Sequence, residues 1–538
     1  MPMNRDSFYK GTFILTAAGI VVKIIGSLNW VFVSRILGGE GIGLYQMAFP
    51  IYLMALSVST AGIPVAISII TAERLALGDI LGARRIFRIS LTILTVTGIF
   101  FSAATYLGAE WLIDWRFIRD SRAYYSIVAL APAIFFVTML SSYRGYLQGW
   151  QRMTPTAVSQ VVEQIFRVIT MILFAQMLLP SGLEFAAAGA SLGAFAGAVT
   201  GFIVLLYYNR KLEREIAEKV AAQKRKACGN KGDSCGKIIK RIFFLALPVS
   251  ASSLMLPIVA NLDLMIVPMR LEVAGFTVAE ATEYFGYLTG MAVPLTNLAT
   301  ILTAALAVSL VPAISEAQAL GDKARIAFRT GAAMRIATII TFPAFILIFM
   351  LHTEISTLIY NAPLAGPTVG YLATAIVFLG IHQVTTGILQ GLGHTTVPLI
   401  NMAFAAVAKV GLNWVLTAIP ALGILGAAIA TTVDIGLAAV MNLYFIHRYI
   451  SYRVSLTESV KAMIAAGVMA VAIYLAYNGV ATATDSIIVM TVASAFVGVI
   501  VYSSVLLLFG MIRREDVAGV PYIGDKLTQL FFRIGVFR

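Results

Sequence analysis

Residues 11–35 read GTFILTAAGIVVKIIGSLNWVFVSR, an apolar run in which Lys23 is the single charge before Arg35 ends it. A helix rises about 1.5 Å per residue, so this run is long enough to cross a hydrocarbon core roughly 30 Å thick. The run is too long for the core of a signal peptide and lacks a small-residue cleavage site. We therefore expect a retained first transmembrane helix.

Similar apolar runs recur along all 538 residues, of which 59% are hydrophobic and 12% charged, and the mean hydropathy is +0.89. This composition excludes a soluble globular protein. The runs are also longer than the alternating segments of about 10 residues that form outer-membrane barrels. We expect an all-α, polytopic membrane protein of about fourteen transmembrane helices. The expected spans are 11–35, 44–70, 88–109, 124–146, 157–179, 186–208, 242–268, 284–310, 328–351, 368–390, 397–419, 424–446, 458–478 and 486–511.

The formal charge of +13 would suggest a nucleic-acid partner in a soluble protein, but here the charges can be placed by loop. With the N-terminus inside, the inner segments hold 26 Lys and Arg and the outer loops hold 4, namely Arg116, Arg119, Arg122 and Arg270. The positive-inside rule then predicts a multi-pass protein of the cell membrane with both termini in the cytoplasm. The basic residues need no nucleic acid, and we expect them to contact anionic membrane lipids.

Motifs for ATP-driven transport and for metal binding are missing from the sequence. No G-x-x-x-x-G-K-[ST] loop is present to bind ATP. Cys228 and Cys235 lie in a Lys-rich segment without neighbouring histidines, and their role stays open. The expected outer loops are too short to supply the catalytic carboxylates of a membrane glycosyltransferase. We expect a monomeric transporter without catalytic residues, metal, cofactor or ATP.

The two halves of the chain resemble each other. Residues 73–79 read ERLALGD and residues 316–322 read EAQALGD, an offset of 243. A second match, at an offset of 242, pairs Gly145, Leu147, Gln148, Gly149 and Thr154 with Gly387, Leu389, Gln390, Gly391 and Thr396. A third match pairs Glu40 and Gly43 with Glu283 and Gly286. Six expected helices intervene, so the halves have the same orientation and should be related by an axis along the membrane normal.

The repeat predicts how the chain divides. We expect a six-helix lobe at 1–208, a basic cytoplasmic linker loop at 209–241, a second six-helix lobe at 242–448, two extra helices at 449–511 and a cytoplasmic tail at 512–538. Pairs of pseudo-symmetric bundles commonly enclose a substrate site near the midplane and rock about it. The expected architecture is therefore that of a transporter.

The fifth expected helix carries a polar stripe. Gln160, Glu163, Gln164 and Arg167 follow the spacing i, i+3, i+4, i+7 and so share one helix face. Ionisable groups in lipid are costly, so this face must meet a cavity or a protein partner. Glu163 and Arg167, four residues apart, could also pair simply to hold helices together. We favour the interpretation that the stripe lines a cavity.

Other charges are expected deep in the membrane. At an offset of 242, Arg167 falls on Lys409, which lies mid-span with Asn413 one turn further on. Lys23 adds a third buried cation, and Asn29 lies on a neighbouring face of the same helix. Lys23 and Lys409 have no carboxylate beside them in sequence, which favours an anionic ligand over an ion pair.

The acidic residues within the expected helices and the charged residues near helix ends are assigned less specific roles. Asp263 and Asp434 would either balance the cations or bind a coupling ion, and the sequence does not distinguish these roles. Arg35, Glu40 and Glu283 lie at the outer ends of expected helices, where pairing among them would close the outer face. For Arg35 and Arg144, both near helix ends, snorkelling to the membrane surface is the favoured interpretation.

Six segments can be compared together with known families. They are KGTFILTAAG (10–19), RILGGEGIGLY (35–45), GIPVAIS (62–68), YRGYLQG (143–149), SQVVEQIFR (159–167) and VPAISE (311–316). Together they resemble the stage V sporulation protein B family of polysaccharide-biosynthesis transporters. The resemblance spans nearly the whole chain outside residues 209–241. It places the chain in the multidrug, oligosaccharidyl-lipid and polysaccharide exporter superfamily, whose members include lipid II flippases of cell-wall synthesis.

The resemblance implies outward flipping of a polyprenyl-pyrophosphate-linked glycan, such as a peptidoglycan precursor, by alternating access. In such flippases basic residues of the first helix bind the pyrophosphate, and Lys23 matches one of these positions, whereas Trp30 stands where a basic residue is common. The alternative is a cation-coupled multidrug exporter of the same superfamily, which would favour an acidic cavity in the first half. A membrane scaffold or scramblase would not need the polar stripe. The exact glycan, the coupling ion and a vegetative or sporulation role stay open.

Overall fold

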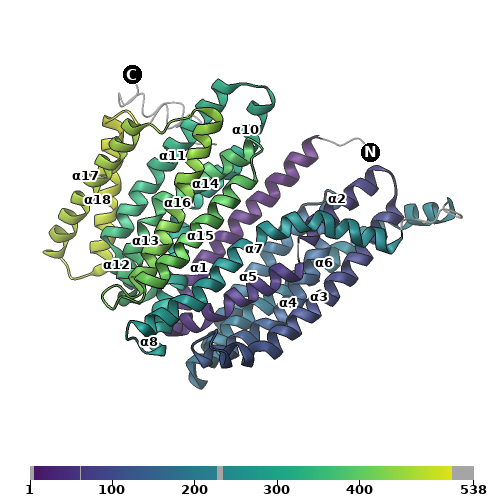
Figure 1. The fold of residues 1–538 in the computed structure, drawn as a ribbon, viewed down its shortest axis with the longest axis horizontal. Coiled ribbons are helices and arrows are strands. Elements are labelled where there is room, and N and C mark those ends of the chain that lie inside the picture. The colour runs from purple at the N-terminus through teal and green to yellow at the C-terminus, as the bar shows by residue number, and fades with distance from the viewer. Residues whose placement is uncertain (1–4, 61, 227–233, 512–538) are drawn as a thin grey trace. The chain divides into compact units, whose positions relative to one another are not determined.

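The computed structural model describes residues 5–60, 62–226 and 234–511, and these ranges form helices without any β-strand (Figure 1). Twelve of the described helices are long and apolar enough to cross a membrane, or thirteen if the bent pair Pro363–Ala373 and Ala375–Gly391 is one span. One of the twelve, Ala17–Ala76, is 60 residues long and covers two expected spans. Counted as two crossings, it brings the described part of the chain to about fourteen, as the sequence predicts.

The described helices form two compact units that divide after Gly286. In the first unit α3, α4, α5 and α6 pack side by side, and α1 packs on α4, α5, α7 and α8. The helices of this unit are α1 (Arg5–Thr60), α2 (Ile63–Ala76), α3 (Ile80–Asp114), η1 (Ser121–Ala123), α4 (Tyr124–Gly149), α5 (Thr154–Leu178), η2 (Leu179–Ser181), α6 (Leu183–Lys226), α7 (Cys235–Val273) and α8 (Val278–Gly286).

In the second unit α14 packs on α10, α11 and α16, α15 packs on α16, and the hairpin of α17 and α18 packs on α11. The helices of this unit are η3 (Tyr287–Ala292), α9 (Val293–Ala299), α10 (Ile301–Ala319), α11 (Lys323–Met350), α12 (His352–Tyr360), η4 (Pro363–Ala365), α13 (Gly366–Ala373), α14 (Ala375–Gly391), α15 (Thr396–Leu416), α16 (Ile424–Ile450), α17 (Leu456–Ala481) and α18 (Ile487–Leu508). The lobe boundaries expected from the repeat, at 208 and 242, remain a prediction.

Two glycines interrupt the helical segment at the start of the chain, Gly38 between the first two expected spans and Gly62 within the second. Gly38 has φ 65° and ψ −173°, so α1 consists of two helices joined at this residue. Gly62 has φ 66° directly before α2, which begins with Ile63 and Pro64. A positive φ is readily adopted by glycine and costly for other residues. The second expected span, 44–70, is consequently broken at Gly62.

The LGD motif of the repeat ends one helix and begins the next. Gly78 and Gly321 have φ 74° and 67°, the left-handed conformation that commonly ends a helix. The carboxylates of Asp79 and Asp322 then accept hydrogen bonds from Gly82 N–H, at 2.7 Å, and Arg325 N–H, at 2.9 Å, and so cap α3 and α11. The motif recurs because both halves need the same turn at the same place.

Packing contacts obey the same offset and confirm the repeat. A Cβ added to Gly145 would lie 2.5 Å from the carbonyl oxygen of Pro64, and one added to Gly387 would lie 2.6 Å from that of Ala307. Pro64 and Ala307 are themselves 243 residues apart. The α4–α2 contact of the first unit and the α14–α10 contact of the second are therefore equivalent, and both require glycine because the backbones touch.

The expected linker loop is mostly helical where the structure describes it. α6 continues to Lys226 and α7 begins at Cys235, so the segment extends two neighbouring helices; Cys228 lies outside the described residues. Gln223 accepts hydrogen bonds from Ile80 N–H and Leu81 N–H at the start of α3. Ion pairs of Arg84 with Glu213, Arg152 with Glu215 and Arg241 with Glu73 bind the same segment to the ends of α2–α5. The segment is thus held by both of its charge types: Glu213 and Glu215 pair with arginines outside it, and Arg241 pairs with Glu73.

Candidate functional site

A ladder of glycines on α6 holds the polar α5 in place. Gly189, Gly193, Gly197 and Gly201 recur every fourth residue and face α5. A Cβ added to Gly197 would lie 2.7 Å from the carbonyl oxygen of Glu163 and 2.9 Å from Cβ of Arg167. Small residues at this spacing let membrane helices approach closely. The spacing is visible in the sequence, although the sequence analysis did not use it.

Glu163 lies between two arginines from different helices. Its Oε1 accepts a hydrogen bond from Arg167 Nη2 at 3.0 Å, and its Oε2 accepts one from Arg144 Nη2 at 2.9 Å. Arg144 Nε also donates to Ser159 Oγ at 3.1 Å. Arg144 on α4 thus points into the protein and does not snorkel, which corrects the interpretation from sequence. We call Arg144, Glu163 and Arg167 the arginine cluster; it carries one net positive charge.

The arginine cluster is mostly shielded from solvent, with side-chain exposures of 17%, 13% and 22% for Arg144, Glu163 and Arg167. Arg167 Nε is buried and has no hydrogen-bond partner among the described residues. A buried donor without a partner is costly, and a cation in a membrane protein usually faces a partner or a cavity. The cluster therefore retains both a surplus positive charge and an unused N–H group.

Aromatic side chains of α1 border the arginine cluster. Tyr45 and Tyr52 are buried on α1, which packs on α5, and both phenols are near enough to Arg167 to interact with it electrostatically. Trp30, Tyr45, Phe49 and Tyr52 form a chain of ring contacts with successive centroid distances of 5.7, 5.6 and 5.8 Å. The arginine cluster is thus enclosed by α4, α5 and an aromatic face of α1. Sequence reasoning missed the two tyrosines, although their spacing of seven places them on one helix face.

The remaining first-unit candidates lie around this cluster in different ways. Gln164 Nε2 lies against Gly26, since a Cβ added to this glycine would be 3.3 Å from it. Asn29 is buried, donates to Met171 Sδ at 3.1 Å and has an unpartnered Oδ1. Gln160 is half-buried on α5. Lys23, one turn before Gly26, is exposed in the structure, which corrects the expectation of a buried cation at this position. Gln164 and Gly26 show that the polar stripe of α5 packs on the first helix, and a shared site there remains a prediction.

In the second unit, Lys409 and Asn413 are buried on α15, with 6% and 1% of their surfaces exposed. They lie on the same helix as Asn401, whose Nδ2 donates to Asn442 Oδ1 of α16 at 2.8 Å. Asn442 in turn donates to Thr385 Oγ1 of α14 at 3.2 Å. Polar groups thus recur inside this unit. Because each unit is described by itself, the convergence of Lys409 with Lys23 and Arg167 stays a prediction.

The two candidate acids are half-buried. Asp263 lies on α7 and Asp434 on α16. No group of three or more His, Cys, Asp and Glu in the described ranges is arranged to hold a metal ion. The roles of Asp263 and Asp434 in charge balance or ion coupling remain predictions.

The end of the first unit that contains Glu40 holds a further charge cluster. Arg122 Nη2 lies 2.7 Å from Glu40 Oε1 and 2.7 Å from Asp120 Oδ2. Asp120 is buried and also accepts a hydrogen bond from Thr282 Oγ1 of α8 at 2.9 Å. From the sequence, Arg35 is expected to pair with the acids Glu40 and Glu283, and the structure adds Arg122 as a partner of Glu40. The roles of Arg35, Glu40 and Glu283 as a gate stay a prediction.

The extra helices are attached through α11. Arg335 is buried, and its Nη1 lies 3.8 Å from Glu458 Oε1 of α17. The Tyr502 hydroxyl of α18 donates to the Ile339 carbonyl oxygen at 3.2 Å. The hairpin therefore belongs to the second unit by specific polar contacts as well as by apolar packing.

Comparison with known proteins identifies the family. The model of the polysaccharide biosynthesis protein family matches residues 8–318, more than half of the chain, and the MatE model matches residues 288–415. Stage V sporulation protein B of Bacillus subtilis is 28% identical over 98% of this chain and 100% of its own. The lipid II flippase MurJ of the same organism is 25% identical over 86% of this chain and 87% of its own.

The fold agrees with these relatives. A solved structure of lipid II flippase MurJ in an inward closed conformation matches with a TM-score of 0.70, covering 92% of this chain and 98% of that chain at 14% identity. At 14% sequence identity, this match supports the fold and not the function. The MurJ relatives are named as lipid II flippases, a further matching structure is named as a multidrug resistance transporter, and the relatives are not enzymes. The chain is therefore a multi-pass membrane transporter that belongs to the polysaccharide biosynthesis protein family.

Proposed function

We propose that this transporter flips a polyprenyl-pyrophosphate-linked glycan from the inner to the outer leaflet by alternating access. The arginine cluster carries the proposal, because it has a surplus positive charge and an unused Arg167 N–H inside a membrane-spanning unit. Such a cluster suits an anion that brings its own acceptor oxygens. The lipid-linked substrate named for the MurJ relative has this chemistry.

Arg167 is the central ligand in this proposal. Glu163 orients its guanidinium, and Gln160, Gln164, Lys23 and Asn29 contribute from α5 and α1. Lys409 and Asn413 are the corresponding ligands of the second unit, and Asp263 and Asp434 balance charge. Arg35, Glu40 and Glu283 form a gate, to which the contacts of Glu40 add Arg122.

The membrane potential can drive such a cycle without ATP. With the inside negative, each negative charge moving outward gains up to about 2.3 kcal/mol per 100 mV. The same field favours the inward return of an empty cationic cavity. A pyrophosphate substrate, which carries two or more negative charges, is therefore exported downhill.

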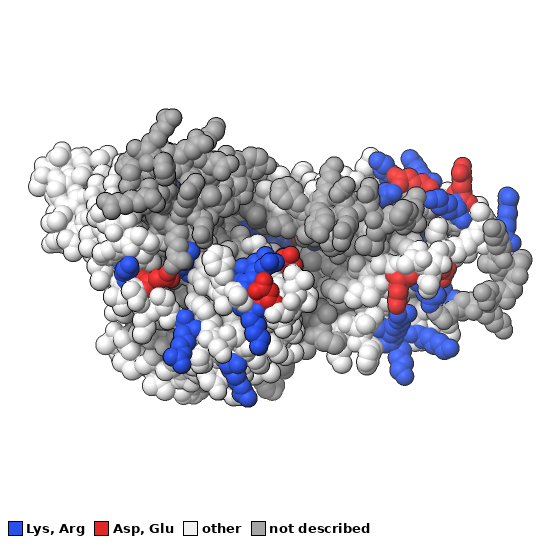
Figure 2. Space-filling view, turned by 90° about the horizontal axis from the view of Figure 1, so that it is seen from above, with Lys and Arg blue, Asp and Glu red and all other residues white. Residues whose placement is uncertain are grey.

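The outward direction requires that the basic segments be cytoplasmic. Figure 2 shows Lys and Arg side chains, with Asp and Glu among them, in separate groups. Most of the basic residues lie in segments that the positive-inside rule assigns to the cytoplasm. We therefore place both termini and the segment 209–241 inside.

A cation-coupled multidrug exporter is the second candidate, because the MatE family model matches residues 288–415. Such an exporter needs acidic groups to bind the coupling cation or a cationic drug. In the first unit, however, Glu163 is already bonded to two arginines. This pairing favours an anionic substrate.

Reconstituted protein tests the two functions directly. Proteoliposomes containing fluorescent lipid II or other polyprenyl-linked glycans are scored for headgroup exposure on the far leaflet, with a cationic dye as the competing substrate. We expect glycan flipping that Arg167→Gln reduces at least tenfold, and no dye transport. Dye transport coupled to Na⁺ or H⁺, without glycan flipping, would support the exporter instead.

A further inference from the structure

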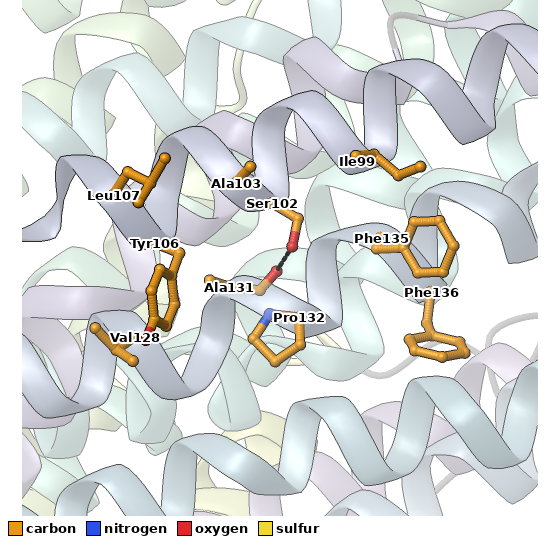
Figure 3. Close-up of a pocket in the computed structure, with 10 residues that line it drawn as sticks. All are labelled: Ile99, Ser102, Ala103, Tyr106, Leu107, Val128, Ala131, Pro132, Phe135 and Phe136. Carbon is orange, nitrogen blue, oxygen red and sulfur yellow. Dashed lines mark hydrogen bonds between the residues drawn. The ribbon is translucent and has the colours of Figure 1, made fainter.

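A groove between α3 and α4 lies on the surface of the first unit, away from the arginine cluster (Figure 3). Its volume is about 560 Å³, within the usual range of ligand pockets. The lining is mostly apolar and contains two hydroxyl groups, those of Ser102 and Tyr106. Ser102 Oγ already donates to the Ala131 carbonyl oxygen at 2.8 Å. The lining residues are Ile99, Ser102, Ala103, Tyr106, Leu107, Val128, Ala131, Pro132, Phe135 and Phe136.

The groove lies where both helices carry small side chains. Ala103 of α3 and Ala131 of α4 line it between larger residues. At Gly98 the helices are close, and an added Cβ would lie 3.3 Å from Thr138 Cβ and 3.4 Å from Phe135 Cα. The groove therefore ends near Gly98, and its other end, at Leu107 and Val128, lies toward the loop that joins α3 to α4.

Charged residues of both signs lie beyond the end of the groove at Leu107 and Val128. Glu110 follows Tyr106 and Leu107 by four and three residues, so it continues the groove-lining face of α3, and Asp114 continues it by one more turn. Glu110, Asp114 and the loop residue Arg116 are all exposed. The other two loop arginines are occupied, Arg119 by Glu272 and Arg122 by Asp120 and Glu40.

Two tryptophans place this end at the membrane surface. Trp111 and Trp115 are 56% and 71% exposed, and their ring centroids lie 5.0 Å apart. Exposed tryptophans gather where a membrane protein crosses the lipid headgroups. The apolar groove, the tryptophans and the charged residues thus follow one another in the same order as the acyl-chain region, the interface and the headgroups of a membrane leaflet.

We propose that this groove binds a phosphatidylethanolamine molecule of the adjacent leaflet. One acyl chain occupies the groove, the phosphate pairs with Arg116, and the ammonium group donates to Glu110 and Asp114. An anionic phosphatidylglycerol would meet one cation and two carboxylates, and a phosphatidylcholine has no N–H group to donate. The site does not depend on the transported substrate, because its residues are separate from the arginine cluster.

Native mass spectrometry of the full chain tests the site. The detergent-solubilised protein is mixed with equal amounts of phosphatidylethanolamine, phosphatidylcholine and phosphatidylglycerol, and the retained lipids are counted by headgroup. We expect preferential retention of phosphatidylethanolamine. The double variant Glu110→Gln and Asp114→Asn should lower this preference about fivefold, the factor that corresponds to one surface ion pair.

Ala103→Phe fills the groove and should abolish retention of the preferred lipid. Ala104→Phe is the matched control, because Ala104 is the next residue, is exposed and does not line the groove. Thermal unfolding of both variants checks that they fold. Equal retention of the three headgroups, or equal effects of Ala103→Phe and Ala104→Phe, would overturn the proposal. Displacement of phosphatidylethanolamine by a polyprenyl phosphate would do so too, because the groove would then belong to the substrate pathway.

Discussion

Glu163 is the residue on which the proposed anion site depends. A carboxylate bonded to two arginines stays paired when one arginine is removed, because the other still compensates its charge. If Glu163 were paired with Arg167 alone, removal of Arg167 would leave a buried carboxylate without a counter-charge and would lower the stability. The contact with Arg144 therefore separates the effect on stability from the effect on transport.

Arg167→Gln should change the thermal stability little and reduce flipping at least tenfold. The remaining pair of Arg144 and Glu163 is neutral, so the unfolding free energy should fall by no more than about 1 kcal/mol. Thermal unfolding in detergent and flipping in proteoliposomes are measured on the same preparation. A large loss of stability with normal flipping would assign Arg167 to structure and not to transport.

Glu163→Gln should be the destabilising change, because it leaves Arg144 and Arg167 close together without a counter-charge. Removing one partner of a buried ion pair costs roughly 3 to 5 kcal/mol, and partial exposure of this cluster reduces the cost toward the lower value. Adding Arg144→Gln should restore most of the stability. Thermal unfolding of the single and double variants gives the coupling, and independent, additive effects would contradict the cluster.

At the scale of elements, close helix contacts decide where side chains meet. α1 and α8 touch at Gly43 and Gly286, which are equivalent in the repeat. A Cβ added to Gly286 would lie 2.7 Å from Gly43 N, and one added to Gly43 would overlap the Thr282 carbonyl oxygen. Such contacts require glycine, so both halves keep it at this position for a physical reason.

Gly43→Ala should destabilise the first unit, by about 1 to 3 kcal/mol as for other overpacked contacts. Gly108→Ala is the matched control, because it also lies within a helix but meets nothing within 4 Å. The control should be neutral or stabilising by up to about 1 kcal/mol, since alanine favours the helix. Thermal unfolding of the two variants measures the difference. Equal changes in the unfolding free energy would show that the α1–α8 contact can accommodate an added methyl group.

At the scale of the whole molecule, the direction of transport depends on orientation and field. Cys235 is a free, exposed cysteine whose Sγ accepts a hydrogen bond from Arg85 Nη2 at 3.5 Å. Cys228 lies seven residues before it in the sequence. Both belong to the segment that we place in the cytoplasm. They therefore report the orientation of the native chain without any substitution.

Membrane-impermeant thiol reagents should label these cysteines in inverted vesicles and leave them unlabelled in intact cells. The physical reason is the excess of Lys and Arg in the segment 209–241, which holds eleven of them. A variant with both cysteines changed to serine controls for non-specific labelling. Labelling from outside intact cells would invert the topology and with it the proposed outward direction.

Flipping of an anionic glycan lipid should respond to the membrane potential. Imposing an inside-negative potential with a K⁺ gradient and valinomycin should raise the outward rate at least about fivefold, equivalent to ~1 kcal/mol. Reversing the gradient should lower it. A rate that does not change with the potential would show that charge movement does not limit the cycle.

The sequence by itself determined the helices, their approximate number, the repeat and the family resemblance. These features are local: an apolar run, a glycine that ends a helix and an aspartate that caps the next one act within a few residues. They also placed Glu163 and Arg167 on one face of α5, because helical spacing is a local property.

Only the tertiary structure decided which charges meet across helices. Arg144 reaches Glu163 because the close packing of α4, α5 and α6 brings their backbones together, and the glycine ladder allows that approach. Arg122 reaches Glu40 because the loop after α3 folds back onto α1. Sequence spacing can pair residues on one helix, whereas partners on different helices follow from how those helices pack.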